Sequence, residues 1–319
     1  MMRGPDHSRI VLWALVLGLA WGHATRPCRA HEGPEHEIEE ITELIETRGE
    51  SAHLLLERAV EYQVLGRLSE AARDLNRASE LDPGSIHVRR ELARVRWLEG
   101  KADAAVETLT RAARLEAPEQ ADLAGVFALR AEILRSQGHW RRALDDCEKA
   151  IAGHGANPEW YLLRSDLQHR LGRERKRVEG LEEGLRRTGA GILVVERIEA
   201  LLDAGRYREA LAAVEPELAS ARLQGRWLIR RGRARLGLGD RAAGEGDLRA
   251  GLEEIDRRLD RQRPDTTLLW DRAMAQLALG DREAARQTYA WARDRGGNPD
   301  LAERLRVLVA DPEPKRRRR

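Results

Sequence analysis

Aromatic residues are scarce in this sequence of 319 residues: they make up 4% of it, and Phe127 is the single phenylalanine. Strands draw on aromatic and β-branched residues, so this scarcity argues against a β fold. Ala, Leu, Arg and Glu are abundant instead, and all four are good helix formers except where packing overrides them. With 42% hydrophobic residues the chain can still bury a large core. The composition therefore predicts an all-α fold.

Cysteine is almost absent, with Cys28 and Cys147 as the two examples. Two cysteines allow at most one disulfide, which excludes a small disulfide-stapled scaffold. The fold must therefore be held by packing rather than by covalent bridges.

The sequence also lacks a hydrophobic run near its start that is long enough to cross a membrane. The apolar run from Ile10 to Trp21 has twelve residues, well short of the roughly 20 that a spanning helix needs. Arg3 and Arg9 precede it, and small residues follow, as in a secretory signal peptide. We expect residues 1–30 to be a signal peptide that directs the chain to the periplasm or outside the cell. Cleavage after Ala30 or after Ala24 remains open; the first leaves one cysteine in the mature chain and the second leaves two.

The chain has no large excess of either charge, since its formal net charge is +2. Cleavage after Ala30 would leave 52 basic and 53 acidic residues. The exception is the block KRRRR at 315–319, which follows Pro312 and Pro314. Such blocks are usually disordered and solvated, so 312–319 is expected to be a basic disordered tail. Contact of this tail with an anionic surface is the alternative, and nucleic acid is an unlikely partner for an exported chain.

Catalytic motifs are missing as well. The sequence contains no glycine-rich phosphate loop, no nucleophile elbow and no HExxH. Cys147 falls at a core-packing place, where a buried inert thiol is expected. We predict that the protein is not an enzyme, has no catalytic residues and needs no cofactor.

What the sequence does contain is an internal repeat of about 34 residues. "GRLSEAARDLNRASELDP" at 66–83 returns as "GKADAAVETLTRAARLEAP" at 100–118. The opening glycine recurs seven times, at Gly66, Gly100, Gly138, Gly172, Gly205, Gly239 and Gly280. Mostly small residues stand seven positions before and five positions after each of these glycines, and a larger residue stands nine positions after most of them.

These spacings predict two antiparallel helices per repeat. The glycine can adopt the left-handed conformation that ends the first helix. Small residues on both sides of the turn let the two helices approach closely, and the larger residue fills the groove between them. One hairpin cannot cover its own apolar stripe, so the repeats are expected to stack into a solenoid.

At these positions the chain resembles the tetratricopeptide repeat family. The residues of the first repeat that carry the resemblance are Leu55, Ala59, Tyr62, Gly66, Ala71, Leu75, Ala78 and Pro83. The resemblance implies a right-handed superhelical solenoid of about seven hairpins over residues 52–299. A helix within 31–51 would cap its start and a helix over 300–311 its end. The whole layout also resembles uncharacterised exported bacterial proteins with these repeats.

The fourth to sixth repeats depart from the family pattern. Arg177 replaces the small residue after the turn of the fourth repeat, and Gly184 weakens its second helix. Pro216 lies inside the second helix of the fifth repeat and predicts a kink. The second helix of the sixth repeat is expected to continue to about Arg261.

The resemblance also implies that the first helices line a concave groove that binds an extended peptide or a helix of a partner protein. Basic side chains gather there, and we expect them to recognise an acidic segment or a carboxylate. The candidate residues are Arg90, Arg94, Trp97, Arg135, His169, Arg170 and Arg233. Glu132, Asp166 and Glu199 make the charge mixed, and the alternative is an ordinary solvated surface. Leu56 and Val60 stand where a chaperone-tail clamp requires lysine and asparagine, so that mode of binding is not expected.

The start of the mature chain offers a second candidate site. His31 and His36 lie among Glu32, Glu35 and Glu37, and imidazole and carboxylate groups suit transition metals. A metal-binding envelope protein is therefore the alternative function. The other interpretation of this segment is an acidic cap that leads into a helix from about Ile38.

Overall fold

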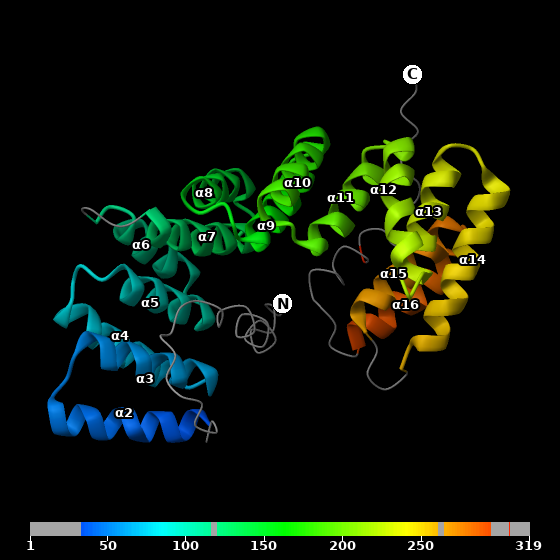
Figure 1. Cartoon of the computed structure of the whole chain (residues 1–319). Helices are drawn as coiled ribbons and strands as arrows, with labels where there is room; N and C mark the ends of the chain where they lie inside the picture. The colour runs from blue at the N-terminus through cyan, green and yellow to red at the C-terminus, as the bar shows by residue number, and fades with distance from the viewer. Residues whose placement is uncertain (1–32, 116–119, 261–264, 295–305, 307–319) are drawn as a thin grey trace, which may run out of the picture. The chain divides into compact units, whose positions relative to one another are not determined.

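The computed structural model describes residues 33–115, 120–260 and 265–294 together with Arg306. All regular structure in these ranges is α-helical (Figure 1), which confirms the all-α prediction. The helices are α2 (Pro34–Arg48), α3 (Ala52–Val64), α4 (Leu68–Leu81), α5 (Ile86–Leu98), α6 (Ala102–Ala112), α7 (Gln120–Ser136), α8 (Trp140–Gly153), α9 (Pro158–Arg170), α10 (Glu174–Thr188), α11 (Gly191–Asp203), α12 (Tyr207–Ser220), α13 (Gly225–Gly237), α14 (Arg241–Arg258), α15 (Thr266–Ala278) and α16 (Arg282–Asp294). The expected signal peptide, the basic tail and, apart from Arg306, the helix over 300–311 lie outside the described residues.

The chain divides into two compact units. The N-terminal unit contains the residues up to Arg173 and Glu183–Ala190, and the C-terminal unit contains Glu174–Glu182 and the residues from Gly191 onward. Within each unit, helices that follow one another in the sequence pack side by side (Figure 1). Helix α10 contributes to both units.

The helices from α3 to α16 form seven hairpins, one for each repeat glycine. We call the first helix of a hairpin its A helix and the second its B helix. All seven glycines have φ between 67° and 88°. At every turn the residue after the glycine donates its backbone N–H to the carbonyl four residues before the glycine, as in Arg67 N to Tyr62 O at 2.8 Å. This is the Schellman arrangement that a left-handed C-terminal residue permits, and it confirms the predicted solenoid of seven hairpins.

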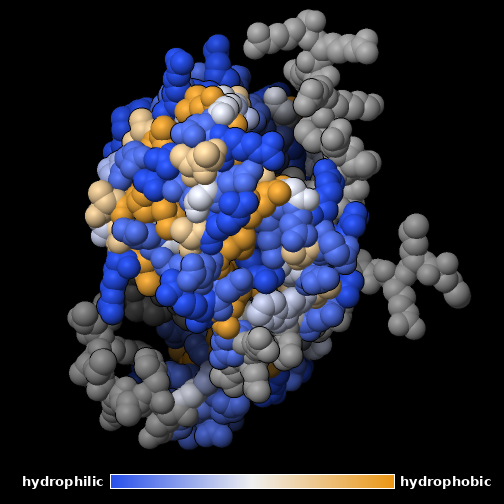
Figure 2. Space-filling view, turned by 90° about the vertical axis from the view of Figure 1, so that its right-hand side faces the viewer, coloured by the Kyte–Doolittle hydropathy of each residue, from blue (hydrophilic) through white to orange (hydrophobic). Residues whose placement is uncertain are grey.

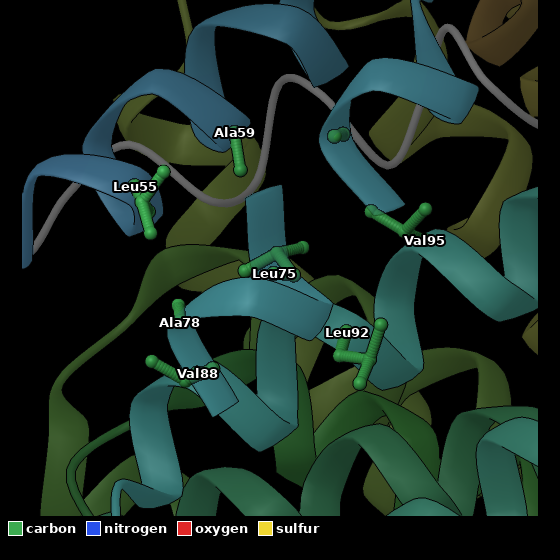
Figure 3. Packing of buried hydrophobic residues seen from close by; sticks show 8 residues of the cluster. Leu55, Ala59, Leu75, Ala78, Val88, Leu92 and Val95 are labelled. Atoms are coloured by element: carbon green, nitrogen blue, oxygen red, sulfur yellow. The ribbon is translucent and has the colours of Figure 1, made fainter. Parts of the chain in front are cut away.

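The small and large repeat positions form the core as expected. In the first repeat Ala59 and Ala71 are 0% exposed, and Leu75 between the helices is equally buried. Figure 3 shows Leu75 of α4 between side chains from α3 and side chains from α5. The B helix therefore packs on its own A helix and on the next one, so neighbouring hairpins share one core.

Helix α2 packs against the first hairpin and begins earlier than the sequence suggested. It starts at Pro34 instead of about Ile38, because proline suits the first helical turn and Gly33 before it adopts φ 99°. Ile38 and Ile41 are buried, and Ile45 packs on the core of the first repeat. The helix thus covers apolar surface that the first hairpin would otherwise expose.

The departures from the family pattern leave the hairpins intact. Helix α10 runs unbroken over 15 residues, and α12 continues through Pro216. Helix α14 is 18 residues long and ends at Arg258, slightly before the expected Arg261. The lengthened B helix of the sixth repeat is therefore confirmed, with its end moved by three residues.

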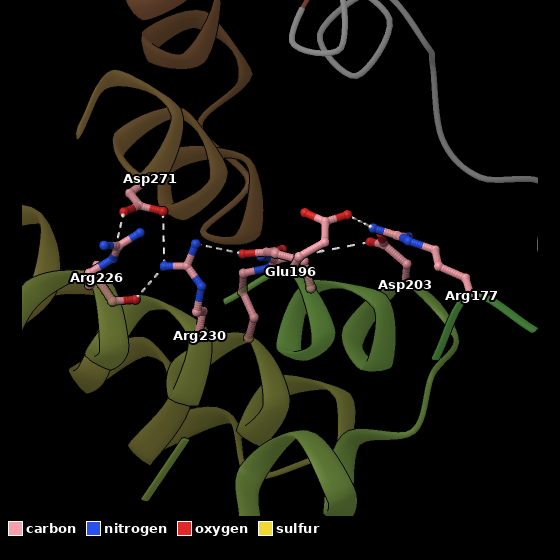
Figure 4. Close-up of polar contacts among 8 residues, drawn as sticks. Arg177, Glu196, Asp203, Arg226, Arg230 and Asp271 are labelled. Atoms are coloured by element: carbon pink, nitrogen blue, oxygen red, sulfur yellow. Dashed lines mark hydrogen bonds and ion pairs between the residues drawn. The ribbon is translucent and has the colours of Figure 1, made fainter. Parts of the chain in front are cut away.

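Arg177 occupies its unusual place because the next A helix supplies carboxylates. Its side chain is 1% exposed, and its Nη2 donates to Glu196 at 2.8 Å while its Nη1 donates to Asp203 at 2.8 Å and Glu174 at 3.1 Å. Figure 4 shows the guanidinium of Arg177 between the two carboxylates of α11. These negative charges outweigh the cost of burial and raise the pKa of Arg177 above its ordinary value.

A recurring arginine bonds six of the seven described hairpins to the helix before it. In the first repeat Arg58 donates to both carboxylate oxygens of Asp74 on α4, at 2.7 and 2.9 Å, and to Thr42 on α2 at 3.1 Å. A guanidinium has five donors in a planar fork, so one side chain serves two acceptors. The same position, one before the small residue of the A helix, carries what we call the ladder arginines: Arg58, Arg130, Arg164, Arg197, Arg231 and Arg272.

Four of the other ladder arginines bond two helices in the same way, whereas Arg197 bonds the preceding helix through Glu182. Arg231, for example, donates to both oxygens of Asp247 at 2.8 Å and pairs with Glu215 of α12 at 3.6 Å. The further pairs are Arg130 with Asp146 and Thr110, Arg164 with Glu183 and Glu148, Arg272 with Thr288 and Asp256, and Arg197 with Glu182. Only the second of the seven described repeats lacks the arginine, and Leu92 takes its place.

Helices α13 and α14 approach each other closely enough for backbone to touch backbone. A Cβ atom on Gly251 would lie 2.7 Å from the carbonyl oxygen of Gly225, and one on Gly232 would lie 2.8 Å from the carbonyl oxygen of Gly244. Even alanine would collide with the opposite main chain here. This explains why the two small positions of the sixth repeat, Gly232 and Gly244, are glycine.

We expect Gly251→Ala to lower the free energy of unfolding by about 1–3 kcal/mol, because the added methyl group forces the two helices apart. Gly246→Ala on the same helix is the control, since nothing lies within 4 Å of its Cβ position. That variant should gain about 1 kcal/mol from helix propensity. Urea denaturation followed by circular dichroism measures both, and equal effects of the two substitutions would contradict the close approach.

We also expect Arg177→Met to lower the free energy of unfolding by about 3–5 kcal/mol, because it leaves Glu196 and Asp203 without their buried counter-charge. Arg175→Met is the matched control on α10, where the arginine is exposed and pairs with exposed Glu179. The same urea titration should show no clear change for the control. A tolerated Arg177→Met would mean that the network contributes nothing to folding.

Candidate protein-binding face

Six of the seven predicted groove residues lie on A helices of the N-terminal unit. Arg90, Arg94 and Trp97 are on α5, Arg135 is on α7, and His169 and Arg170 are on α9. Helix α5 contacts α7, and α7 contacts α9, so the structure brings these side chains onto neighbouring helices. Arg233 is on α13 in the C-terminal unit.

The two arginines of α5 share one carboxylate. Arg90 Nε donates to Glu91 Oε1 at 3.2 Å, and Arg94 Nε donates to Glu91 Oε2 at 3.1 Å. Burial works to raise the pKa of Glu91, but the two guanidinium groups outweigh it and hold this pKa below its ordinary value. Glu91 is therefore a fixed anion that positions both arginines, whose side chains stay 25–28% exposed.

A second shared carboxylate orders the arginines of α7 and α9. Arg170 Nε donates to Asp166 Oδ2 at 2.9 Å, and Arg135 Nη1 lies 3.6 Å from the same oxygen. The guanidinium of Arg170 also lies 5.9 Å from the ring centroid of Trp140, within cation–π range. His169 is exposed beside this cluster.

Glu132 connects the two clusters. Burial raises the pKa of this carboxyl group, and the positive charges of Arg94 and Arg135 only partly oppose the rise. Both arginines are thus close enough to act on one side chain, so the row of charges is continuous from α5 to α9. We call it the A-helix face; its residues are Arg90, Glu91, Arg94, Trp97, Glu132, Arg135, Asp166, His169 and Arg170.

Two contacts fix the position of the face on α5. Trp97 is half-buried and packs on the core cluster of the second repeat, which joins this part of the face to the core. Gly125 of α7 leaves room for Arg90, whose Nη1 would lie 3.0 Å from a Cβ atom there. The guanidinium therefore rests against main chain without a side chain in between.

Arg233 belongs to a different environment, a buried charge network in the C-terminal unit. It is 13% exposed and its Nη1 donates to Glu199 at 2.6 Å. Arg230, 2% exposed, bridges Glu199 at 2.9 Å and Asp271 of α15 at 3.0 Å (Figure 4). Burial raises the pKa of Asp271, although Arg230 partly opposes the rise. In this unit the arginines and carboxylates of the A helices are thus paired with one another.

Of the two histidines predicted to bind a metal, His36 is among the described residues. His36 lies inside α2 with its Nε2 3.3 Å from Glu40 Oε1, and His31 lies outside the described residues. Within the ranges described, no group of three or more His, Cys, Asp or Glu side chains is arranged to hold a metal ion. The predicted pairing of the two histidines on a metal stays a prediction.

Cys147 is placed as the sequence suggested. It is 0% exposed, and its thiol donates to the carbonyl of Trp160 at 3.2 Å. Burial, with a contribution from Glu148, raises the pKa of Cys147 to about 12. The thiol is therefore protonated and shielded, which fits a packing role rather than that of a nucleophile.

Apolar surface is scattered over the described residues. The exposed large hydrophobic side chains are Val64, Leu81, Trp140, Ile192, Leu223 and Leu238. On the face drawn in Figure 2, hydrophilic side chains predominate and hydrophobic residues show in narrow strips between them. None of the described helices combines the length and the apolar character needed to span a bilayer. Polar contacts therefore offer the more specific means of recognition.

The sequence analysis missed the residue that organises the first cluster. Glu91 lies next to Arg90 and three residues before Arg94, and this spacing places a carboxylate within reach of both guanidinium groups on a helix. The spacing was readable, but only the structure shows that one carboxylate serves both arginines.

Comparisons with known proteins agree with this architecture. No protein-family profile matches the chain. The tetratricopeptide repeat and J domain-containing co-chaperone DNJ1 of Fusarium oxysporum is 31% identical over 123 residues, which are 37% of this chain and 23% of that protein. The chain thus matches about a quarter of the length of this relative.

Solved structures resemble the chain over most of its length. A tetratricopeptide repeat protein from Parabacteroides merdae matches with a TM-score of 0.58 and 17% identity, over 82% of this chain and 99% of that one. A chain of the APC/C hetero-tetramer Cut9–Hcn1 matches with a TM-score of 0.50 and 15% identity, over 87% of this chain and 46% of that one. Together with the seven glycine turns and the small-residue contacts, these likenesses establish that the chain has the fold of a tetratricopeptide repeat solenoid.

Proposed function

We propose that this chain is a non-catalytic scaffold that binds an acidic segment of a partner protein on the A-helix face. The observation that carries the proposal is the way in which its arginines are held. Arg90, Arg94 and Arg170 each bond an internal carboxylate through Nε. In the described part of the chain their Nη1 and Nη2 atoms have no carboxylate partner, so these donors remain for a ligand.

This arrangement suits carboxylates on a partner. A guanidinium presents two parallel N–H donors to a carboxylate, and charge-assisted bonds of this kind are among the strongest that proteins make. Because Glu91 and Asp166 already fix the arginines, binding costs little side-chain entropy. The face also carries the negative charge of Glu91, which would repel a partner whose acidic groups do not lie opposite the arginines.

The fold agrees with a role in protein binding. The similar Cut9–Hcn1 structure is a hetero-tetramer, so a solenoid of this kind assembles with another protein there. We leave Arg233 out of the proposed binding face, because its guanidinium is engaged in the buried network of the C-terminal unit.

We further propose that the protein works in the cell envelope, as a periplasmic or secreted chain. The support is the first thirty residues of the sequence, where Arg3 and Arg9 precede the apolar run from Ile10 to Trp21.

The test of the binding face compares capture by the wild-type chain with capture by an Arg90→Gln, Arg94→Gln double variant. Both are immobilised and exposed to an envelope extract at low and moderate salt, and bound proteins are quantified by mass spectrometry. A specific partner should bind about tenfold more weakly or worse to the variant, because each hydrogen bond to a charged group contributes roughly 1.5–3 kcal/mol.

The control is Arg141→Gln with Arg142→Gln, which removes the same charge from exposed positions on the B helix α8. Circular dichroism checks that both double variants are folded. A partner recovered equally by all three chains would show that the A-helix face is not its binding site.

The test of export is the N-terminus of the chain recovered from the envelope fraction of an expressing bacterium. We expect the intact mass of a chain that begins at His31, or at Thr25 if cleavage follows Ala24. Leu15→Arg interrupts the apolar run and should leave the full-length chain inside the cell. An unprocessed wild-type chain found only in the cytoplasm would contradict the proposed location.

A further inference from the structure

A groove of about 370 Å³ opens between the second repeat and its neighbour in the N-terminal unit. Helices α4, α5 and α6 form it, and none of its residues belongs to the A-helix face. The lining residues are Asn76, Ser79, Glu80, Arg89, Leu92, Arg96, Thr108 and Arg111. Its volume falls in the range of small-molecule sites.

This groove lies where the arginine ladder is interrupted. Leu92 stands at the ladder position of the second repeat. Asn76 and Thr108, sixteen residues before and after it, correspond to Thr42 and Asp74 around Arg58. Leucine is shorter than arginine and has no donors, so no guanidinium from this position joins Asn76 to Thr108.

Three arginines surround this groove. Two of them bond neutral groups, and the third pairs with a carboxylate that does not line the groove. Arg96 donates to the Thr108 hydroxyl, and Arg89 donates through Nε and Nη2 to the carbonyl of Pro83, at 3.2 and 2.6 Å. Arg111 pairs with Glu107. Among the described residues no carboxylate lies within ion-pair distance of Arg89 or Arg96. Arg89 and Arg96 therefore contribute positive charge here without the carboxylate partner that the ladder arginines mostly have.

The available hydrogen-bonding groups are mainly donors. Thr108 already donates its hydroxyl hydrogen to Ala104 O at 2.7 Å, so it accepts from Arg96 and holds that guanidinium in place. The remaining Arg96 donors, the Asn76 amide and the Ser79 hydroxyl have no bonding partner among the described residues. The one acid in the lining, Glu80, is bonded to Arg77 at 2.9 Å.

We propose that this groove is a binding site for the phosphate group of a small molecule. Arg89, Arg96 and Arg111 would compensate the charge of a phosphate, and Asn76 and Ser79 would donate to its oxygens. A tetrahedral oxyanion with three or more acceptor oxygens matches donors that come from three helices better than a planar carboxylate does. A ladder arginine is a cation that joins acceptors on neighbouring helices. A bound phosphate would instead be an anion that joins donors on α4, α5 and α6.

Isothermal titration calorimetry of the full chain with inorganic phosphate tests the site, at neutral pH and moderate salt. Arg96→Gln removes a half-buried charge, and Arg111→Gln removes an exposed one at the edge of the groove, where folding is not at risk. We expect each variant to bind phosphate about tenfold more weakly or worse, from the strength of a hydrogen bond to a charged group. Sulfate should compete with phosphate, and acetate at the same concentration should not.

Arg73→Gln is the matched control, because this arginine is exposed on α4 and does not line the groove. If Arg73→Gln binds phosphate as the wild type does, the weaker binding of the groove variants is due to the groove and not to a general loss of positive charge. The proposal is overturned if the wild-type chain does not bind phosphate, if all variants bind it as the wild type does, or if acetate binds equally tightly.

Discussion

The stacking of the hairpins depends on an arginine that must find hydrogen-bond acceptors on two helices at once. A guanidinium buried between helices costs free energy unless acceptors surround it. Arg58 meets this condition with Asp74 on its own B helix and Thr42 on the preceding helix. The requirement fixes the register between consecutive hairpins, because a hairpin displaced along its neighbour would leave a buried cation without acceptors. Apolar packing between small residues supplies attraction, but the arginine adds a geometric condition that leucine and alanine cannot impose.

Two repeats depart from this pattern of one arginine with acceptors on two helices, and each has different polar contacts as a result. In the second repeat the cation is replaced by Leu92, the acceptors become Asn76 and Thr108, and a groove with surplus positive charge opens. In the fourth repeat an additional cation, Arg177, enters the place of a small residue, and three carboxylates surround it. Neither departure leaves a buried cation without acceptors, which is why neither disrupts its hairpin.

The sequence predicted the parts of the fold that depend on local geometry. All seven glycine turns were found from the sequence, because a turn residue in the left-handed conformation is usually glycine. The turns therefore recur in the sequence as glycines about 34 residues apart. The ladder was missed although most of its partners lie sixteen residues from the arginine. An arginine on a helix is ordinarily a solvated residue, and its burial depends on the neighbouring hairpin. Arg177 was interpreted as degenerate for the same reason: its partners Glu196 and Asp203 lie in the following hairpin. The candidate site was predicted as a mainly basic set of residues with Asp166 and Glu132 among them, whereas the role of Glu91 and Asp166 in positioning the arginines required coordinates.

The two units use similar residues for different purposes. On α13, Arg230 and Arg233 are 2% and 13% exposed and are neutralised by carboxylates of neighbouring A helices, so their hydrogen-bonding capacity is spent within the unit. On α5, Arg90 and Arg94 share a single acid and remain about a quarter exposed. The difference is one of burial: Glu199 and Asp271 are themselves buried and hold the α13 arginines inside the unit, whereas Glu91 holds two arginines that stay partly exposed. The partly exposed donors of α5 therefore support the proposal that recognition takes place in the N-terminal unit.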